Sequence, residues 1–464
     1  MADNVWLLLP DKLTIRLFFD AGIVDGLRAR LGPRLVTVFP SEDEARDWEG
    51  RLDGAAVLYT TDLLPIRVGP PEKITRRIDR FLDGQAGFHP LAIRLNHRHG
   101  FHLERMAPGH GNWMLDSARV GALPRWGWIE RAMGRWHFSP RRYVPHRLLE
   151  RMRRECTALV LSNVQPHTAV PFLLAARRLG LPVAAHVASW DHTVGKGVIA
   201  SFCDVYVVQN RAMEDDLARY HGIGAERVVV TGWPQTDVYH RRRPREDYDT
   251  LVRSFGLDPA LPLVVVMGNT PTNAPYEGRF VERVLSWWDA EARSRLSLLF
   301  RPHPRDRDWR ERFAAALERP GVAVQEASFT DFEALATLLQ HCACVVANAG
   351  TILLDSLVND RPAVCVLYDE GAPPGESFAL KNVLGEHYRE LTASKAFYRA
   401  GSFEEVVTGI ERALADPGEL AQERRRVSRE VVGEVDGRAA ERVVDAIATT
   451  LAVSGGSERP RPTG

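Results

Sequence analysis

Apolar residues along this chain form short runs that alternate with amphipathic stretches, a pattern typical of parallel strands joined by helices. In the first half, the runs that predict strands are Val5–Leu9, Leu35–Phe39, Ala55–Tyr59, Ala158–Ser162, Val183–Val187 and Val205–Val208. In the second half, they are Leu263–Gly268, Leu296–Phe300, Val322–Val324, Cys344–Ala347 and Ala363–Leu367. The pattern predicts an α/β fold with two doubly wound, Rossmann-like domains.

The two halves are separated by an arginine-rich stretch, and 464 residues exceed what one hydrophobic core usually supports. We therefore expect an N-terminal domain at residues 1–240, a linker at 241–258 and a C-terminal domain at 259–430. A helix at 431–452 and a disordered tail at 453–464 complete the prediction. Ligands in such domains bind beyond the carboxyl ends of the strands, so a central cleft is the expected active site.

The most informative motif is Asn348-Ala-Gly-Thr351, which lies between a buried strand and a helical pattern. Free backbone N–H groups and the positive end of the helix dipole would face this loop, and Gly350 lets an anion approach the main chain. Asp355, one turn into the helix, is then placed to reach a ribose hydroxyl. A purely structural loop is the alternative, because parallel sheets need small residues at such turns.

Two other strand ends of the second half carry candidate phosphate contacts. Gly268-Asn-Thr270 follows one strand, and Arg301-Pro-His303 follows another, where a guanidinium beside an imidazole suits a diphosphate. In the alternative interpretation, Arg301 pairs with a structural carboxylate and His303 fills a polar corner. Thr330 or Asp331 is interpreted as the N-cap of the following helix, with capping as its favoured role.

In the first half, a loop after the strand that ends near Val187 holds Asp191, His192 and Lys196. Asp191 or His192 could deprotonate an incoming hydroxyl, and Lys196 could meet a phosphate. A capped loop whose polar groups only satisfy the backbone is an equal alternative. Gln165 and His167 follow an earlier strand and are candidate acceptor or phosphate contacts.

Together these motifs resemble the GT-B superfamily, mainly over residues 155–410. This superfamily includes nucleotide-sugar glycosyltransferases, non-hydrolysing UDP-N-acetylglucosamine 2-epimerases and CDP-glycerol glycerophosphotransferases. Arg301-Pro-His-Pro304, the loop 348–351 and Asp355 resemble the segments by which the glycerophosphotransferases bind the CDP moiety. Trp190-Asp-His-Thr193 is similar to their Trp-His-Gly-Thr loop, with Asp191 where the catalytic His would stand. The loop as a whole looks most like that of bacterial surface-carbohydrate glycosyltransferases.

Composition adds further expectations. Lys plus Arg equals Asp plus Glu at 60 each, which gives no electrostatic reason to expect nucleic acid. Five cysteines without a paired spacing favour a reducing cytoplasm, and neither a metal site nor a cofactor is expected. No apolar stretch is long enough to span a bilayer. Residues 119–154 are rich in arginine and aromatic residues, which suits peripheral contact with an anionic membrane; a solvated basic helix is equally plausible.

We therefore predict a metal-independent GT-B glycosyltransferase of cell-surface or secondary-metabolite glycan synthesis. A nucleotide-diphosphate sugar, such as a UDP-sugar, would bind the C-terminal domain through Gly268, Asn269, Thr270, Asn348 and Thr351 besides the residues above. The N-terminal domain would present a hydroxyl acceptor, which is lipid-linked in one version of the hypothesis. His303 is a further catalytic candidate. A CDP-glycerol-type glycerophosphotransferase, an epimerase and a non-catalytic nucleotide-sugar-binding protein are the alternatives.

Overall fold

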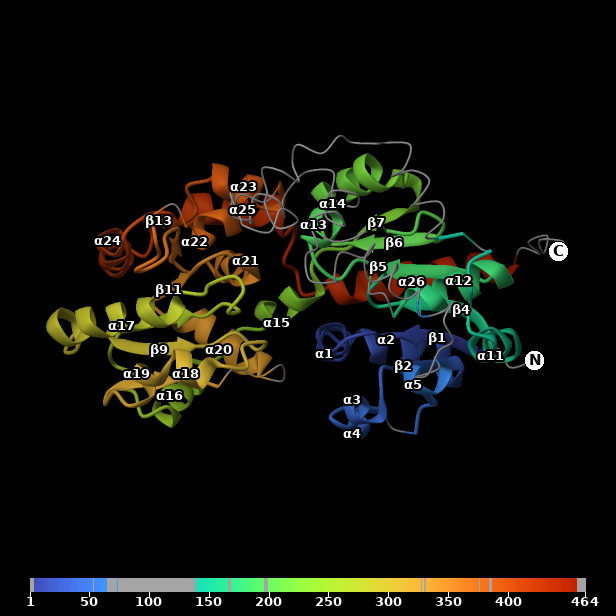
Figure 1. Ribbon diagram of the computed structural model, residues 1–464, viewed down its shortest axis with the longest axis horizontal. Coiled ribbons are helices and arrows are strands. Elements are labelled where there is room, and N and C mark those ends of the chain that lie inside the picture. The colour runs from blue at the N-terminus through green and yellow to red at the C-terminus, as the bar shows by residue number, and fades with distance from the viewer. Residues whose placement is uncertain are drawn as a thin grey trace. The chain divides into compact units, whose positions relative to one another are not determined.

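The computed structural model describes residues 4–52, 54–64, 73, 138–139, 141–165, 168–195, 199–326, 328, 331–374, 376–383 and 386–456. The chain forms two compact units (Figure 1). Unit 1 comprises Met1–Gln235 and Arg438–Gly464, and unit 2 comprises Thr236–Gly437. Each unit is built around one parallel β-sheet with helices on its faces, so the predicted α/β class with two doubly wound sheets is confirmed.

Unit 1 contains a seven-stranded sheet in the order β3-β2-β1-β4-β5-β6-β7. Its strands are β1 Asn4–Leu8, β2 Leu35–Phe39, β3 Val57–Tyr59, β4 Cys156–Leu161, β5 Val183–His186, β6 Val205–Val208 and β7 Val228–Val230. Its helices are α1 Lys12–Asp20, α2 Ile23–Leu31, α3 Glu42–Arg46, α4 Glu49–Leu52, α5 Thr60–Leu63, α11 His146–Glu155, α12 Val170–Leu179, α13 His192–Gly195, α14 Arg211–Asp216 and α26 Ala439–Gly456.

Unit 2 contains a six-stranded sheet in the order β10-β9-β8-β11-β12-β13. Its strands are β8 Leu263–Met267, β9 Ser297–Arg301, β10 Val322–Val324, β11 Cys344–Ala347, β12 Ala363–Val366 and β13 Tyr398–Ala400. Its helices are α15 Asp237–His240, α16 Arg245–Ser254, α17 Glu277–Trp287, α18 Trp309–Arg312, α19 Ala314–Leu317, α20 Phe332–His341, α21 Thr351–Val358, α22 Phe378–Asn382, α23 Arg389–Ala393, α24 Phe403–Ala415 and α25 Ala421–Val431.

The central strands are buried from end to end, which explains why they appear as unbroken apolar runs. All residues of β8, β9, β11 and β12 are buried, as expected for parallel strands with helices on both faces. In each unit the chain starts a strand in the middle of the sheet, adds two strands on one side, and then returns to the other side. This return creates a switch point between β1 and β4 in unit 1, and between β8 and β11 in unit 2.

Several predicted boundaries differ from the structure. The predicted linker at 241–258 contains α16, which lies in unit 2, and the C-terminal helix α26 belongs to unit 1. There, Val443, Val444 and Ile447 join the apolar core, and α26 packs against α2, β5 and β6. The edge strands β7 and β13 were not predicted; each contains exposed residues and so lacks an unbroken buried run. Residues 457–464, which form most of the predicted disordered tail, lie outside the described residues.

Two further observations concern the cysteines and the apolar character of the helices. All five cysteines are buried free thiols. Among the helices that the structure describes, none combines the length and apolar character needed to cross a bilayer.

Candidate active site

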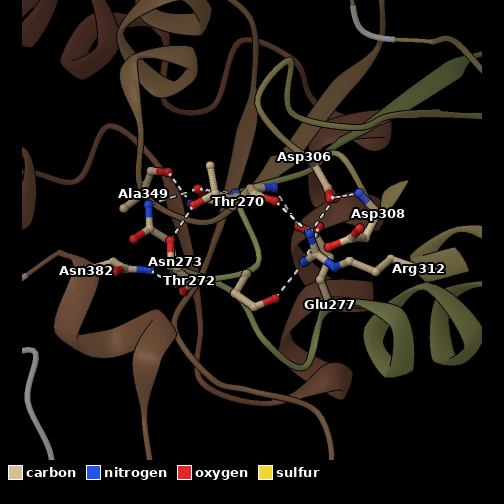
Figure 2. Close-up of polar contacts among 11 residues, drawn as sticks. Thr270, Thr272, Asn273, Glu277, Asp306, Asp308, Arg312, Ala349 and Asn382 are labelled. Carbon is tan, nitrogen blue, oxygen red and sulfur yellow. Dashed lines mark hydrogen bonds and ion pairs between the residues drawn. The ribbon is translucent and has the colours of Figure 1, made fainter. Parts of the chain in front are cut away.

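The loops at the switch point of unit 2 are connected directly by side-chain hydrogen bonds. Asn269 follows β8, and its Nδ2 donates to the carbonyl oxygen of Ala349, which follows β11, at 3.2 Å. The Asn269 Oδ1 accepts from the backbone amide of Thr270 at 2.8 Å and from Asn273 Nδ2 at 3.2 Å. Figure 2 shows Thr270, Asn273 and Ala349 in this cluster. The structure therefore brings together two of the predicted donor-binding loops at the edge where ligands of doubly wound sheets bind.

Gly350 gives the second loop its shape. Its φ is +144°, a value that favours glycine, and it occupies the N-cap position of α21. Thr351, the first residue of the helix, is exposed. The Leu353 amide donates to the Gly350 carbonyl oxygen at 3.3 Å. Because a glycine brings no capping side chain, the amides of Thr351 and Ile352 are left to a ligand or to water. Together with the helix dipole, these amides suit a phosphate, as the sequence predicts.

Asn348 has a different environment from the one expected. Its Nδ2 donates to the carbonyl oxygens of Val366 at 2.7 Å and Ala379 at 2.9 Å, and its Oδ1 accepts from Asn382 Nδ2 at 2.8 Å. Both ends of the amide therefore bond to neighbouring segments of the protein. These bonds hold the ends of β11 and β12 against α22, so the side chain shapes the loop, while its predicted donor contact stays a prediction.

Arg301 ends β9 and is buried, and it makes a bidentate ion pair with Asp331. The two N···O distances are both 2.8 Å, and Gln325 Oε1 accepts a third bond at 3.0 Å. Asp331 stands at the N-cap of α20, as predicted, but its carboxylate makes no capping bond. Thr330, the other N-cap candidate, lies outside the described residues. A bidentate pair with a buried guanidinium is stronger than one bond to an amide. The diphosphate role of Arg301 stays a prediction, since its charge already faces a carboxylate.

His303, two residues further, has one defined tautomer. Its Nδ1 accepts the backbone N–H of Arg305 at 3.0 Å, so a neutral ring carries its proton on Nε2. Burial and the nearby cations Arg305 and Arg312 lower the pKa of His303 to about 4. At neutral pH the imidazole is therefore uncharged, and its Nε2–H is a hydrogen-bond donor rather than a cation. This state suits contact with a phosphate oxygen.

A buried ionic cluster, which the sequence analysis missed, holds the loop after β8. Arg312 contacts Glu277 Oε2 at 2.8 Å and also pairs with Asp306 (Figure 2). The same guanidinium donates to the carbonyl oxygens of Asn269 at 3.0 Å and Ala274 at 2.6 Å. Glu277 Oε1 accepts the Asn269 amide at 2.7 Å. Arg312 thus fixes the switch-point loop against the turn that carries His303, because Asp306 N donates to the His303 carbonyl oxygen at 2.8 Å.

One carboxyl group of this cluster, that of Glu277, has a shifted pKa. Burial raises the pKa of Glu277 to about 8, while Arg312 and the Asn269 amide act in the opposite direction. Gly268 is also constrained here, because a Cβ would lie 3.0 Å from the Phe313 ring and 3.1 Å from the Pro302 Cα. Gly268 is therefore required for close packing, while its predicted donor contact stays a prediction.

Asp355 lies in the second turn of α21 and is only 4% exposed. Its carbonyl oxygen accepts the Asn359 side chain at 2.8 Å. A ribose hydroxyl reaches this carboxylate only if neighbouring groups move, so its ribose-binding role stays a prediction.

In unit 1 the switch point is bridged in a similar way. Asn163 Nδ2, after β4, donates to Asp11 Oδ2, after β1, at 3.3 Å. Gln165 Nε2 donates to the carbonyl oxygen of His192 at 2.7 Å, so it supports the loop that holds Asp191 and His192. Gln165 therefore holds the candidate base loop, and its acceptor contact stays a prediction.

Some predicted groups lie outside the described residues, namely Lys196, His167 and most of the 119–154 segment. Within the part of that segment that is described, Arg142 is buried and its carbonyl oxygen accepts Arg178 Nη2 at 2.6 Å. Arg142 is thus a packed residue of the fold. Across the described residues, no group of three or more His, Cys, Asp or Glu is arranged to hold a metal ion.

Comparison with known proteins identifies the family. The model for CDP-glycerol:poly(glycerophosphate) glycerophosphotransferase matches residues 178–449, more than half of the chain, and the chain belongs to this family. Its members are transferases, so the predicted enzyme class is confirmed at that level. No curated protein matches this chain in a sequence search.

Solved structures share the fold at low sequence identity. The S. aureus protein MnaA, in a co-structure with UDP, is 12% identical with a TM-score of 0.53, and the match covers 100% of each chain. UDP-GlcNAc 2-epimerase from Neisseria meningitidis, bound to UDP-GlcNAc, is 8% identical with a TM-score of 0.56 over 96% of this chain and 100% of that one. A structure of the wall teichoic acid polymerase TagF with CDPG is 10% identical, with a TM-score of 0.49 over 97% of this chain and 90% of that one. The fold is GT-B, as predicted.

Proposed function

We propose that this protein transfers a glycerophosphate-type group from a CDP-linked donor to a hydroxyl of a cell-wall or cell-surface polymer. The observation that carries this proposal is the family match, which covers the end of unit 1 and the whole of unit 2. The bonded strand-end loops of unit 2 support it, because they present amides and a neutral imidazole where doubly wound folds bind nucleotides.

The donor diphosphate would lie at the start of α21. The amides after Gly350 and the helix dipole would stabilise its negative charge, and the Nε2–H of His303 would donate to one of its oxygens. Asn269 and the Arg312 cluster would keep the loop after β8 in place during this contact. Phosphoryl transfer needs mainly positioning and charge stabilisation, which these groups supply.

The reaction step follows from the donor. The acceptor oxygen forms a bond to the phosphorus that carries glycerol, the phosphoanhydride P–O bond breaks, and CMP leaves with the electron pair. Asp191 or His192 would take the proton of the acceptor hydroxyl. The acceptor would be the end of the growing polymer, and a lipid-linked acceptor near a membrane, contacted through 119–154, remains part of the proposal.

Glycosyl transfer from a nucleotide sugar is the second candidate. Asp191 favours it, since it stands where the glycerophosphotransferase loop, as the resemblance implies, carries a histidine. In this reaction the acceptor oxygen would attack the anomeric carbon and a nucleoside diphosphate would leave.

The leaving group distinguishes these candidates. The full-length protein would be incubated with a glycerophosphate oligomer and either CDP-glycerol or a UDP-, GDP- or dTDP-sugar, and the released nucleotides would be separated by chromatography. We expect acceptor-dependent release of CMP from CDP-glycerol. Release of a nucleoside diphosphate would instead establish glycosyl transfer. Interconversion of a UDP-sugar without acceptor would identify an epimerase, and donor binding without consumption would identify a silent binding protein.

A further inference from the structure

The turn that carries Asp191 and His192 is held at the next residue, Thr193, by two side chains from one helix. Asp216 Oδ2 accepts from the Thr193 hydroxyl at 2.8 Å, and His221 Nε2 lies 2.8 Å from the Thr193 carbonyl oxygen. Asp216 ends α14, and His221 is five residues further along the chain. The two side chains therefore bond to both the side chain and the backbone of Thr193, the residue after His192.

The helix conformation makes this double contact possible. Residues Leu217–His221 form a π-helical turn directly after α14. In an α-helix, residues five apart point about 140° away from each other, because each residue turns the helix by about 100°. A π-turn instead bonds residue i to residue i+5, which places Asp216 and His221 on nearly the same face. Such turns are rare and occur frequently at functional sites.

His221 also bonds to a second segment. Its Nδ1 accepts the backbone N–H of Ile199 at 3.1 Å. Because an amide can only donate, the neutral ring carries its proton on Nε2 and donates it to Thr193. One imidazole thus connects Thr193, which precedes residues 194–198, with Ile199, which follows them.

We propose that His221 is a positioning residue, a clamp that holds Thr193 and Ile199 and so places the group that deprotonates the acceptor. This proposal deepens the proposed function and rests on it. The imidazole has both the donor and the acceptor that the two backbone groups need, and the π-turn brings it to Thr193 together with Asp216. Asp191 and His192 then lie on a turn that is held by this pair and also by Gln165, whose Nε2 donates to the His192 carbonyl oxygen at 2.7 Å.

The first test compares His221→Phe, which removes both bonds, with His221→Gln, whose amide keeps one donor and one acceptor. His240→Gln is the matched control, since His240 is exposed and has no role in the proposed site. We expect His221→Phe to lower kcat by about 10- to 100-fold, because small displacements of reacting groups have effects of this size. KM for the donor should change little, as the donor is assigned to unit 2. His221→Gln should recover part of the loss, and His240→Gln should match wild type.

A double-mutant cycle separates positioning from loss of folded protein. If His221 acts through the base, His221→Phe should have little further effect once the base is removed by Asp191→Asn or His192→Asn. Full multiplication of the two effects in both backgrounds would overturn the proposal, because a loss of folded protein multiplies in this way.

Amide hydrogen exchange tests the clamp without any turnover. We expect the Ile199 amide to exchange about tenfold faster in His221→Phe than in wild type, consistent with loss of one hydrogen bond. Unchanged exchange at Ile199 would overturn the clamp even in an active enzyme. If no donor is consumed by the wild type, the proposed function fails, while faster exchange in the variant would still establish the clamp.

Discussion

Replacing Glu277 with glutamine should change how the stability of the protein depends on pH. Burial raises the pKa of Glu277 to about 8 in the folded protein, against 4.5 for an unperturbed glutamate side chain. Between these two values the folded state holds a proton that the unfolded state has released. The free energy of unfolding therefore decreases as pH rises through this window, by about 1.4 kcal/mol per pH unit. Glutamine carries no titrating proton, so the variant lacks this contribution.

The measurement is urea unfolding of both proteins at several pH values. Between roughly pH 5.5 and 7.0, the stability of Glu277→Gln relative to wild type should rise by about 2 kcal/mol. Taking the difference cancels the other titrating groups, including His303, whose lowered pKa acts in the opposite direction. Glu282→Gln, an exposed position on the same helix, is the control and should follow the wild-type slope. A constant difference between Glu277→Gln and wild type would refute a raised pKa for this carboxyl group.

Three further predictions concern the donor loops. Gly350→Ala places a side chain at a φ of +144°, which costs of the order of 1–3 kcal/mol, and should weaken CDP binding by calorimetry; wild-type affinity would contradict the role of this loop. Asp355→Ala should lower donor affinity with little change in kcat, and an unchanged dissociation constant would remove Asp355 from the ribose site. Asp331→Ala leaves the Arg301 guanidinium buried without its carboxylate, so the free energy of unfolding should fall by about 3–5 kcal/mol; a change near zero would show that the pair is not buried in solution.

The fold was predictable because each buried strand is encoded by a short run of neighbouring residues. Strands such as β8 and β11 are short apolar runs that end at a small or polar residue, and parallel strands between helices require this composition. The edge strand β13 was not predictable. It pairs with β12 at the edge of the sheet, and its three residues include the exposed Arg399, which interrupts the apolar pattern. Helix α26 joins a core that includes residues of α2, more than 400 positions earlier, and no local pattern encodes such a contact.

In the candidate site, too, some residues were predictable from the sequence and others were not. Gly350 was predictable, because a glycine between a buried strand and a helix has a local meaning. The Arg312 cluster was not, since its partner Glu277 is 35 residues away in the sequence and charged residues usually lie on the surface. Likewise, Arg301 was recognised as important, but its partner Asp331 resembled an ordinary helix cap. Sequence patterns locate loops, whereas the pairing of distant charges requires the fold.

The central claim is that a CDP-linked donor binds at the strand ends of unit 2, on the amides at the start of α21. Amide hydrogen exchange of the full-length protein with and without saturating CDP tests it most directly. The account predicts slower exchange at Thr351 and Ile352, with no change in β2 and β3 of unit 1. Protection confined to unit 1, or no protection at these amides while CDP is bound, would contradict it.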